Sequence, residues 1–259
     1  MNDATALPAP SPLAQGRAAY CGQLLRLLGW PLLCGGLVFL VFDLSDLDLW
    51  VSDALYDGAS GHFLLQQSAL FHDITFRWTR LLPDAVEKAA MLGLGLAWLG
   101  SWQPRGLANP LAGLRAYRRD FLYVVTAFAV GTWLVQLCKL HTGVECPVEM
   151  ARYGGHAAYG RWFQSFSLWH APARGRCWPS GHAATGFNLL SLYFASRCNG
   201  WQPARWLLLA ILLLGAATGA IRTLQGWHLL SHTLWSAVLV WFCMALLAGL
   251  FYGPRAFGR

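Results

Sequence analysis

The strongest constraint on how this chain folds is a series of six apolar segments, each close to the length of a membrane-spanning helix. They cover residues 24–42, 85–102, 121–138, 182–198, 206–221 and 229–252. Crossing the hydrocarbon core of a bilayer takes about 20 helical residues. Charged residues make up only 12% of the chain, whereas a soluble domain has about 25%. We therefore predict an all-α, polytopic membrane protein with six transmembrane helices, and we exclude a disordered chain and a soluble nucleic-acid-binding protein.

The distribution of basic residues predicts how the helices are oriented. Loops on the cytoplasmic side of a membrane are enriched in Lys and Arg. Ten arginines lie on the side of the six-helix arrangement that holds both termini: Arg17, Arg26, Arg105, Arg115, Arg118, Arg119, Arg197, Arg205, Arg255 and Arg259. We expect a multi-pass protein of the bacterial inner (plasma) membrane with both termini in the cytoplasm.

The chain divides into a short tail and one membrane domain. Residues 1–20 are rich in Ala, Pro and Ser and are predicted to be a disordered cytoplasmic tail, and residues 21–259 form the six-helix domain. The loop 43–84 falls on the periplasmic side. Its segments 47–56 and 71–82 mix aromatic, apolar and charged positions, which fits interfacial helices and a loop packed over the bundle equally well.

Three short polar segments lie next to predicted span ends on the periplasmic side. They cover residues 139–147, 177–182 and 222–232. Ionisable residues at such positions, facing the interior of a bundle, are candidates for function. Three segments that end in the same layer are able to form one shared site.

The side chains in these segments are typical of a phosphate site. Lys139 and Arg222 supply two cations, and an Arg side chain can donate two parallel hydrogen bonds to phosphate. Ser180 and Gly181 precede a predicted helix, whose first N–H groups attract anions. His182 and His228 are the minimum for covalent phosphoryl transfer, in which one imidazole attacks phosphorus and the other protonates the leaving oxygen.

The three segments together resemble the type 2 phosphatidic acid phosphatase superfamily, the lipid phosphate phosphatases related to vanadium haloperoxidases. The family pattern is Lys, six residues, Arg-Pro; then Pro-Ser-Gly-His; then Ser-Arg, five residues, His, three residues, Asp. Here Lys139 is followed after six residues by Cys146-Pro147, and residues 179–182 match completely. Arg222, His228 and His232 keep the spacing of the third motif.

The resemblance implies a role for each matching residue. His228 would be the nucleophile that forms a phosphohistidine, and His182 the general acid. The groups that would hold phosphate are Lys139, Arg222, Ser180 and Gly181. It implies no metal and no cofactor. The substrate would be a lipid phosphate or diphosphate in the membrane, hydrolysed or transferred to a second lipid, and no nucleic acid would bind. The alternative is a catalytically degenerate relative that binds phospholipid or assists transport; the oligomeric state does not follow from the sequence.

Two departures from the family pattern need replacements. Cys146 stands where the family has Arg, and Arg152, Arg174 or Arg176 could supply the missing cation. His232 stands where the family has the Asp that orients the nucleophile. Since His232 follows His228 by one helical turn, it can face the same way, but a neutral imidazole offers no negative charge. Glu145, Glu149 or an acid from the loop 43–84 are the other candidates for this role.

Two of the seven cysteines, Cys146 and Cys177, lie in the periplasmic motif segments. In an oxidising periplasm they could form a disulfide between the two halves of the site, although pairing cannot be deduced from sequence. The histidine pair at positions 228 and 232 could also bind a metal, but two ligands do not make a site, so no metal is predicted.

Overall fold

The chain forms a bundle of helices in a computed structural model that describes residues 12–100, 111–172 and 174–253. The elements in chain order are α1 (Pro12–Val38), the π-helix η1 (Phe39–Asp43), α2 (Leu47–Leu55), β1 (Tyr56–Asp57), β2 (His62–Phe63), α3 (Ala69–Asp73), the π-helix η2 (Ile74–Trp78), α4 (Thr79–Leu99), α5 (Ala112–Arg115), α6 (Arg118–Thr142), the 3-10 helices η4 (Pro147–Glu149) and η5 (Ala151–Tyr153), α7 (Trp162–Ser165), α8 (Gly181–Phe187), α9 (Leu190–Cys198), α10 (Ala204–Leu224) and α11 (Leu230–Tyr252). The prediction of a mainly helical protein is confirmed.

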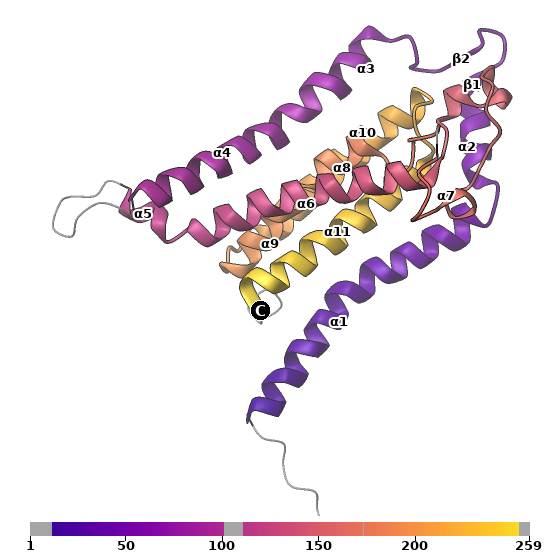
Figure 1. Ribbon diagram of the computed structural model, residues 1–259. Helices are drawn as coiled ribbons and strands as arrows, with labels where there is room; N and C mark the ends of the chain where they lie inside the picture. Colours follow the sequence, from indigo (N-terminus) through magenta and orange to yellow (C-terminus); the bar gives the residue numbers. More distant parts are fainter. Residues whose placement is uncertain (1–11, 101–110, 173, 254–259) are drawn as a thin grey trace, which may run out of the picture.

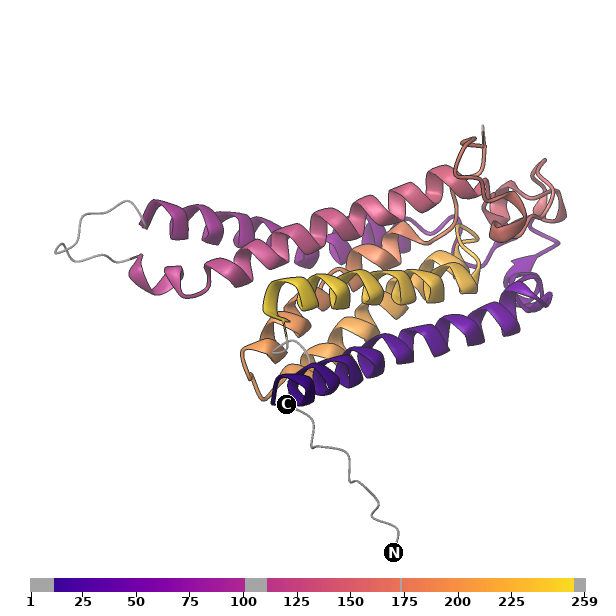
Figure 2. The same cartoon turned by 60° about the horizontal axis from the view of Figure 1, so that its bottom comes forward.

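The centre of the bundle consists of α6, α8, α9, α10 and α11, with α4 packed against α6 and α1 packed along α11 (Figures 1 and 2). The two short strands pair antiparallel beside α2. α1 begins and α11 ends at one end of the bundle, and the loops 44–68 and 143–180 lie at the other end. This second end carries the candidate site.

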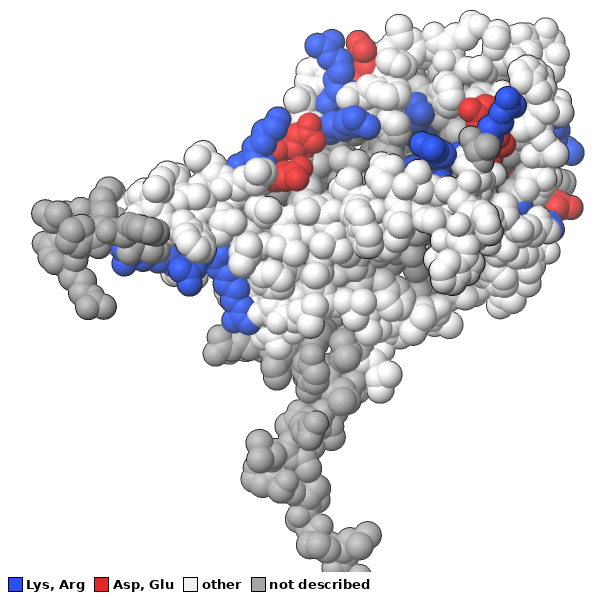
Figure 3. Space-filling model, in the orientation of Figure 1, with Lys and Arg blue, Asp and Glu red and all other residues white. Residues whose placement is uncertain are grey.

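Three helical segments in the described part of the chain are long and apolar enough to cross a membrane: Arg118–Glu149, Ala204–Leu224 and Leu230–Tyr252. Leu27–Asp43 and Leu47–Leu55 together make a fourth if they count as one span bent by 67°. These helices identify a membrane protein. On the face shown, uncharged surface separates the charged groups beside α5 from those near the loops and along α4 (Figure 3). The number of six spans stays a prediction.

The predicted helix 182–198 is two helices, α8 and α9, which are separated at Asn188 and Leu189. At the break, the Asn188 side chain donates a hydrogen bond to Thr132 Oγ1 on α6, at 3.2 Å. α8 also lies very close to α10, since a Cβ atom on Gly186 would be only 3.2 Å from the Cα atom of Gly215. The break between α8 and α9 therefore coincides with a long-range side-chain hydrogen bond and a close glycine contact, which the apolar composition of the segment does not indicate.

The predicted segment boundaries on the N-terminal side also differ from the structure. α1 begins at Pro12, so residues 12–20 of the predicted disordered tail are helical, and residues 1–11 lie outside the described part. Pro is favourable in the first turn of a helix, and the Ala, Gln and Arg that follow are good helix formers. Of the two amphipathic segments, 47–56 corresponds to α2, whereas 71–82 runs through α3 and η2 directly into α4.

Candidate active site

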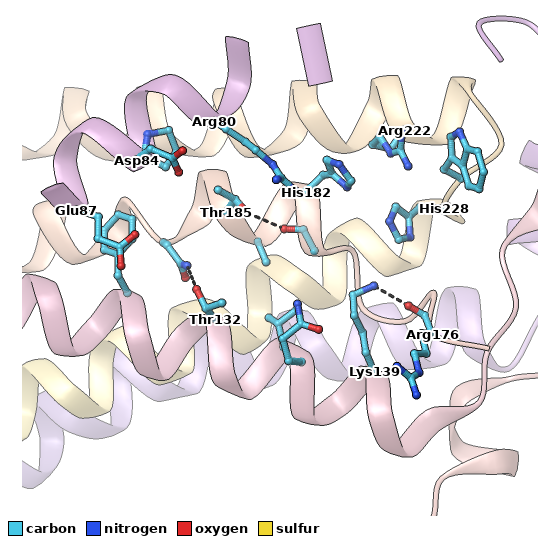
Figure 4. A pocket seen from close by; sticks show the side chains of 18 of the residues that line it. Arg80, Asp84, Glu87, Thr132, Lys139, Arg176, His182, Thr185, Arg222 and His228 are labelled. Carbon is cyan, nitrogen blue, oxygen red and sulfur yellow. Dashed lines mark hydrogen bonds between the residues drawn. The ribbon is translucent and has the colours of Figure 1, made fainter. Parts of the chain in front are cut away.

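The three predicted motif segments meet at one cavity of about 490 Å³. It lies between α4, α6, α8 and the turn that joins α10 to α11 (Figure 4). At one side of the cavity, the charged and imidazole side chains are those of Arg80, Lys139, Arg176, His182, Arg222 and His228. Deeper along α4 the cavity is also lined by Asp84 and Glu87.

A tight turn after α10 places His228. Gly226 has a φ of 74°, and a Cβ atom there would lie 2.2 Å from the Phe63 ring, so only glycine fits. The turn is closed by the backbone N–H of Trp227, which donates to the carbonyl of Arg222 at 3.0 Å. Two elements far apart in the sequence, the strand β2 and the end of α10, thus determine where His228 stands.

The His228 ring is buried, with 4% of the residue exposed, yet it lines the cavity. Its Nδ1 atom lies 3.3 Å from Cys177 Sγ. Because the two ring nitrogens lie on different edges of an imidazole, this contact leaves Nε2 for the cavity. Burial, with a smaller effect of the nearby Lys139 cation, lowers the pKa of His228 well below its usual range. The ring is therefore neutral, which is the nucleophilic form.

His182 stands in the first turn of α8 and faces the same cavity. Its Nε2 atom is buried and has no hydrogen-bond partner among the described residues, and the Phe76 ring packs edge-on against it at 4.8 Å. Gly181 also lines the cavity, beside the stem of Lys139. Ser180 does not: it is fully buried, and its Oγ accepts a hydrogen bond from the backbone N–H of Ala183 at 3.5 Å as the N-cap of α8.

Arg222 is a buried cation, only 5% exposed. Its guanidinium lies between the rings of Phe76 and Trp227, at 5.2 and 5.3 Å, and donates to Gln225 Oε1 at 3.0 Å. Its Nε has no partner, and no carboxylate of the described residues forms an ion pair with it. A buried guanidinium without a counter-charge is costly, so it is prepared to bind an anion.

Lys139 stands on α6 across the cavity from Arg222 (Figure 4). Its Nζ donates to the carbonyl of Arg176 at 2.8 Å, which ties the first motif to the loop that precedes the second. An ammonium group has three N–H donors, so two stay available for a ligand.

The structure places Arg152, a predicted substitute for the missing motif arginine, away from this cavity. Arg152 lies in η5 and forms a two-pronged ion pair with Asp53, at 2.6 and 2.7 Å. The hydrogen bonds from Arg152 lower the pKa of Asp53. The pair explains the placement, because a guanidinium whose donors are engaged by a carboxylate has little left to offer a phosphate.

The additional cations of the cavity are Arg80 and Arg176. The sequence interpretation included Arg176 but missed Arg80, which lies on α4 and interacts electrostatically with His182 and Arg222. The signal was the spacing of Arg80, Asp84 and Glu87: positions three or four apart fall on one helix face. This spacing places the residues on one face only if the segment 71–82 continues as a helix into α4, and in the structure it does.

His228 also faces His232 and a disulfide, one cysteine of which, Cys146, lines the cavity. The disulfide joins Cys146 and Cys177, whose Cα atoms are 5.2 Å apart. His232 is 2% exposed, its ring centroid is 5.7 Å from that of His228, and its Nδ1 has no partner among the described residues.

Among the described residues, no carboxylate forms a hydrogen bond with either the His228 or the His232 ring. An acid of the loop 43–84 does reach α11. Asp48 Oδ1 accepts from the backbone N–H of Ser231 at 3.0 Å, so it satisfies the helix N-terminus and leaves the two imidazoles without a negative partner.

Two histidines and four cations around one cavity of a helical membrane protein are typical of a site for a phosphate group. A comparison with protein families is more specific: residues 120–254 match the PAP2 superfamily. The chain belongs to this superfamily. Comparisons with curated proteins and with solved structures found no significant match. The matched region contains all three motifs, whereas Arg80 and α4 precede it. Family membership supports phosphatase or phosphotransferase activity on phosphate esters.

Proposed function

We propose that the protein is an integral membrane lipid phosphatase or phosphotransferase that works through a phosphohistidine. The observation that carries the proposal is the convergence of His182, His228 and two cations on one cavity, where His182 Nε2 and Arg222 Nε both lack a partner within the described part of the chain. Such groups are satisfied when a phosphate ester binds between them.

In the first step, His228 Nε2 attacks phosphorus as the bond to the leaving oxygen breaks, and His182 gives that oxygen a proton. In the second step, water or a hydroxyl of a second lipid attacks the phosphohistidine and loses its proton to His182. Lys139, Arg222 and the additional arginines stabilise the charge on the equatorial oxygens in a loose transition state. A protonated His182 is needed for the first step, and a bound phosphate dianion favours that form.

The substrate we propose is a lipid phosphate or diphosphate presented at the periplasmic face of a bacterial inner membrane. The cavity lies at the end of the bundle opposite the start of α1 and the end of α11, and the predicted topology places those two ends on the cytoplasmic side. Polyprenyl diphosphate, lipid A, phosphatidylglycerol phosphate and phosphatidic acid all offer the required group.

The test is phosphate release from a panel of these four lipids by purified protein in detergent, with chelator and no added metal. We expect release or transfer with at least one lipid, and a loss of more than about 100-fold in His228→Ala and His182→Ala. The exposed His170 gives a matched control, His170→Ala, which should retain activity. If the folded wild type acts on none of the lipids, the protein is a degenerate phospholipid-binding relative, the alternative that the absence of a carboxylate beside His228 favours.

A further inference from the structure

A second set of ligating side chains lies directly behind the nucleophile. One donor atom each from Cys177, His228 and His232 lies within 4.8 Å of the other two, and all three residues are buried. Cys177 Sγ lies 3.3 Å from His228 Nδ1. In a tetrahedral zinc site, with bonds of about 2.0–2.3 Å, neighbouring donors are about 3.5 Å apart. Small rotations of the side chains would therefore bring the three donors to ligand distances.

The environment of His232 points to a missing ligand. The ring interacts with the backbone of Cys177, but its Nδ1 is buried without a hydrogen-bond partner among the described residues, and buried polar atoms in folded proteins nearly always have one. A metal ion between the three side chains would satisfy it. Thiolate and imidazole are the ligands that Zn²⁺ prefers, and three protein ligands leave the fourth position for water.

The sulfur of Cys177 is held in the disulfide with Cys146 and is not a thiolate in that state. A dithiol can open the disulfide: two electrons and two protons pass to the protein sulfurs, giving two thiols, and the dithiol becomes a disulfide. Binding of the ion to Cys177 then releases the thiol proton to solvent.

We propose that opening of the Cys146–Cys177 disulfide turns Cys177, His228 and His232 into a three-ligand site for Zn²⁺ or a similar ion. The bound ion would hold the nucleophile and stop phosphoryl transfer, because a metal on His228 Nδ1 leaves the ring proton on Nε2, which then has no lone pair to attack phosphorus. This second consequence rests on the proposed function, whereas metal binding itself does not.

The test uses Cys146→Ala, which leaves Cys177 as a free thiol without any reductant. Co²⁺ is the probe, because tetrahedral Co²⁺ with a thiolate ligand absorbs strongly in the near ultraviolet and the visible. We expect one Co²⁺ per chain with the thiolate band in Cys146→Ala, and no band in the oxidised wild type. Adding Cys177→Ser should abolish the band, and adding His232→Ala should weaken binding by at least about 10-fold. Adding Cys34→Ser, at an exposed cysteine far along α1, is the matched control that should change nothing.

Two results would overturn the proposal: no Co²⁺ band in folded Cys146→Ala, or an equal band after Cys177→Ser. If Cys146→Ala does not fold, wild-type protein reduced with a dithiol and desalted under argon gives the same comparison. The absorption does not depend on catalysis, so it distinguishes this proposal from the proposed phosphatase. If the wild type is active, stoichiometric Zn²⁺ should inhibit Cys146→Ala at least about 10-fold more than the oxidised wild type.

Discussion

Replacing Arg80 tests whether the cation missing from the first motif has moved to α4. Arg80 lines the cavity and interacts electrostatically with His182 and Arg222. A hydrogen bond to a charged group contributes about 1.5–3 kcal/mol, which corresponds to about 10- to 150-fold in rate. Because the Arg80 side chain is exposed, we expect the lower end: Arg80→Gln should reduce kcat/KM about 10-fold on the best lipid phosphate.

Arg152→Gln is the matched control for this experiment. It removes the same charge, but from a side chain that is bound to Asp53 outside the cavity. We expect kcat/KM within about 2-fold of the wild type and a loss of stability below about 1 kcal/mol, as for other exposed ion pairs. Phosphate release at several substrate concentrations, together with thermal unfolding in detergent, measures both quantities. If Arg152→Gln lowers kcat/KM as much as Arg80→Gln does, the assignment of the cation to α4 is refuted.

Three further outcomes follow from the geometry. His232→Asp should raise kcat, measured by phosphate release, because a carboxylate beside His228 stabilises the imidazolium that phosphoryl transfer creates; an unchanged or lower kcat would contradict this. Gly226→Ala should cost at least about 1 kcal/mol of stability and most of the activity, since its Cβ would meet Phe63, whereas Gly58→Ala, with open space around it, should melt like the wild type. The lowered pKa of His228 means that protonation, and with it the acidic limb of the kcat/KM profile, begins only below the usual histidine pKa of about 6.5; an acidic limb centred above pH 7 would exclude His228 as its source.

Much of the site could be predicted because the motif residues lie at helix ends, where apolar segments and polar clusters are separate in the sequence. Lys139, His182, Arg222 and His228 all line the cavity. Arg80 could not be predicted, because its position depends on α3, η2 and α4 forming one continuous helical segment. The polar residues of 43–84 make this part of the sequence look like a loop.

Side-chain partners were the other part that the sequence could not determine. Arg152 is a suitable phosphate ligand by type and spacing, but Asp53, about 100 residues earlier, binds it. Ser180 is suitable in the same way, but its hydroxyl caps α8. In both cases the side chain forms its hydrogen bonds with another part of the protein instead of facing the cavity, and this partner is known only from the folded structure.

The two departures from the family pattern, Cys146 and His232, are both found in the side-chain cluster around His228. Cys146, in place of the motif arginine, is bonded to Cys177, and Cys177 touches His228 Nδ1. His232, in place of the motif aspartate, lies against the other side of the same cluster. If the two positions had changed independently in a protein without activity, residues 146 and 232 would not be expected to lie in one cluster. A buried imidazole with an unpartnered nitrogen, as in His232, would also be disfavoured, because such an atom costs stability. The arrangement is better explained as one linked exchange, in which a disulfide and a second histidine stand around His228 where the family has an arginine and a carboxylate.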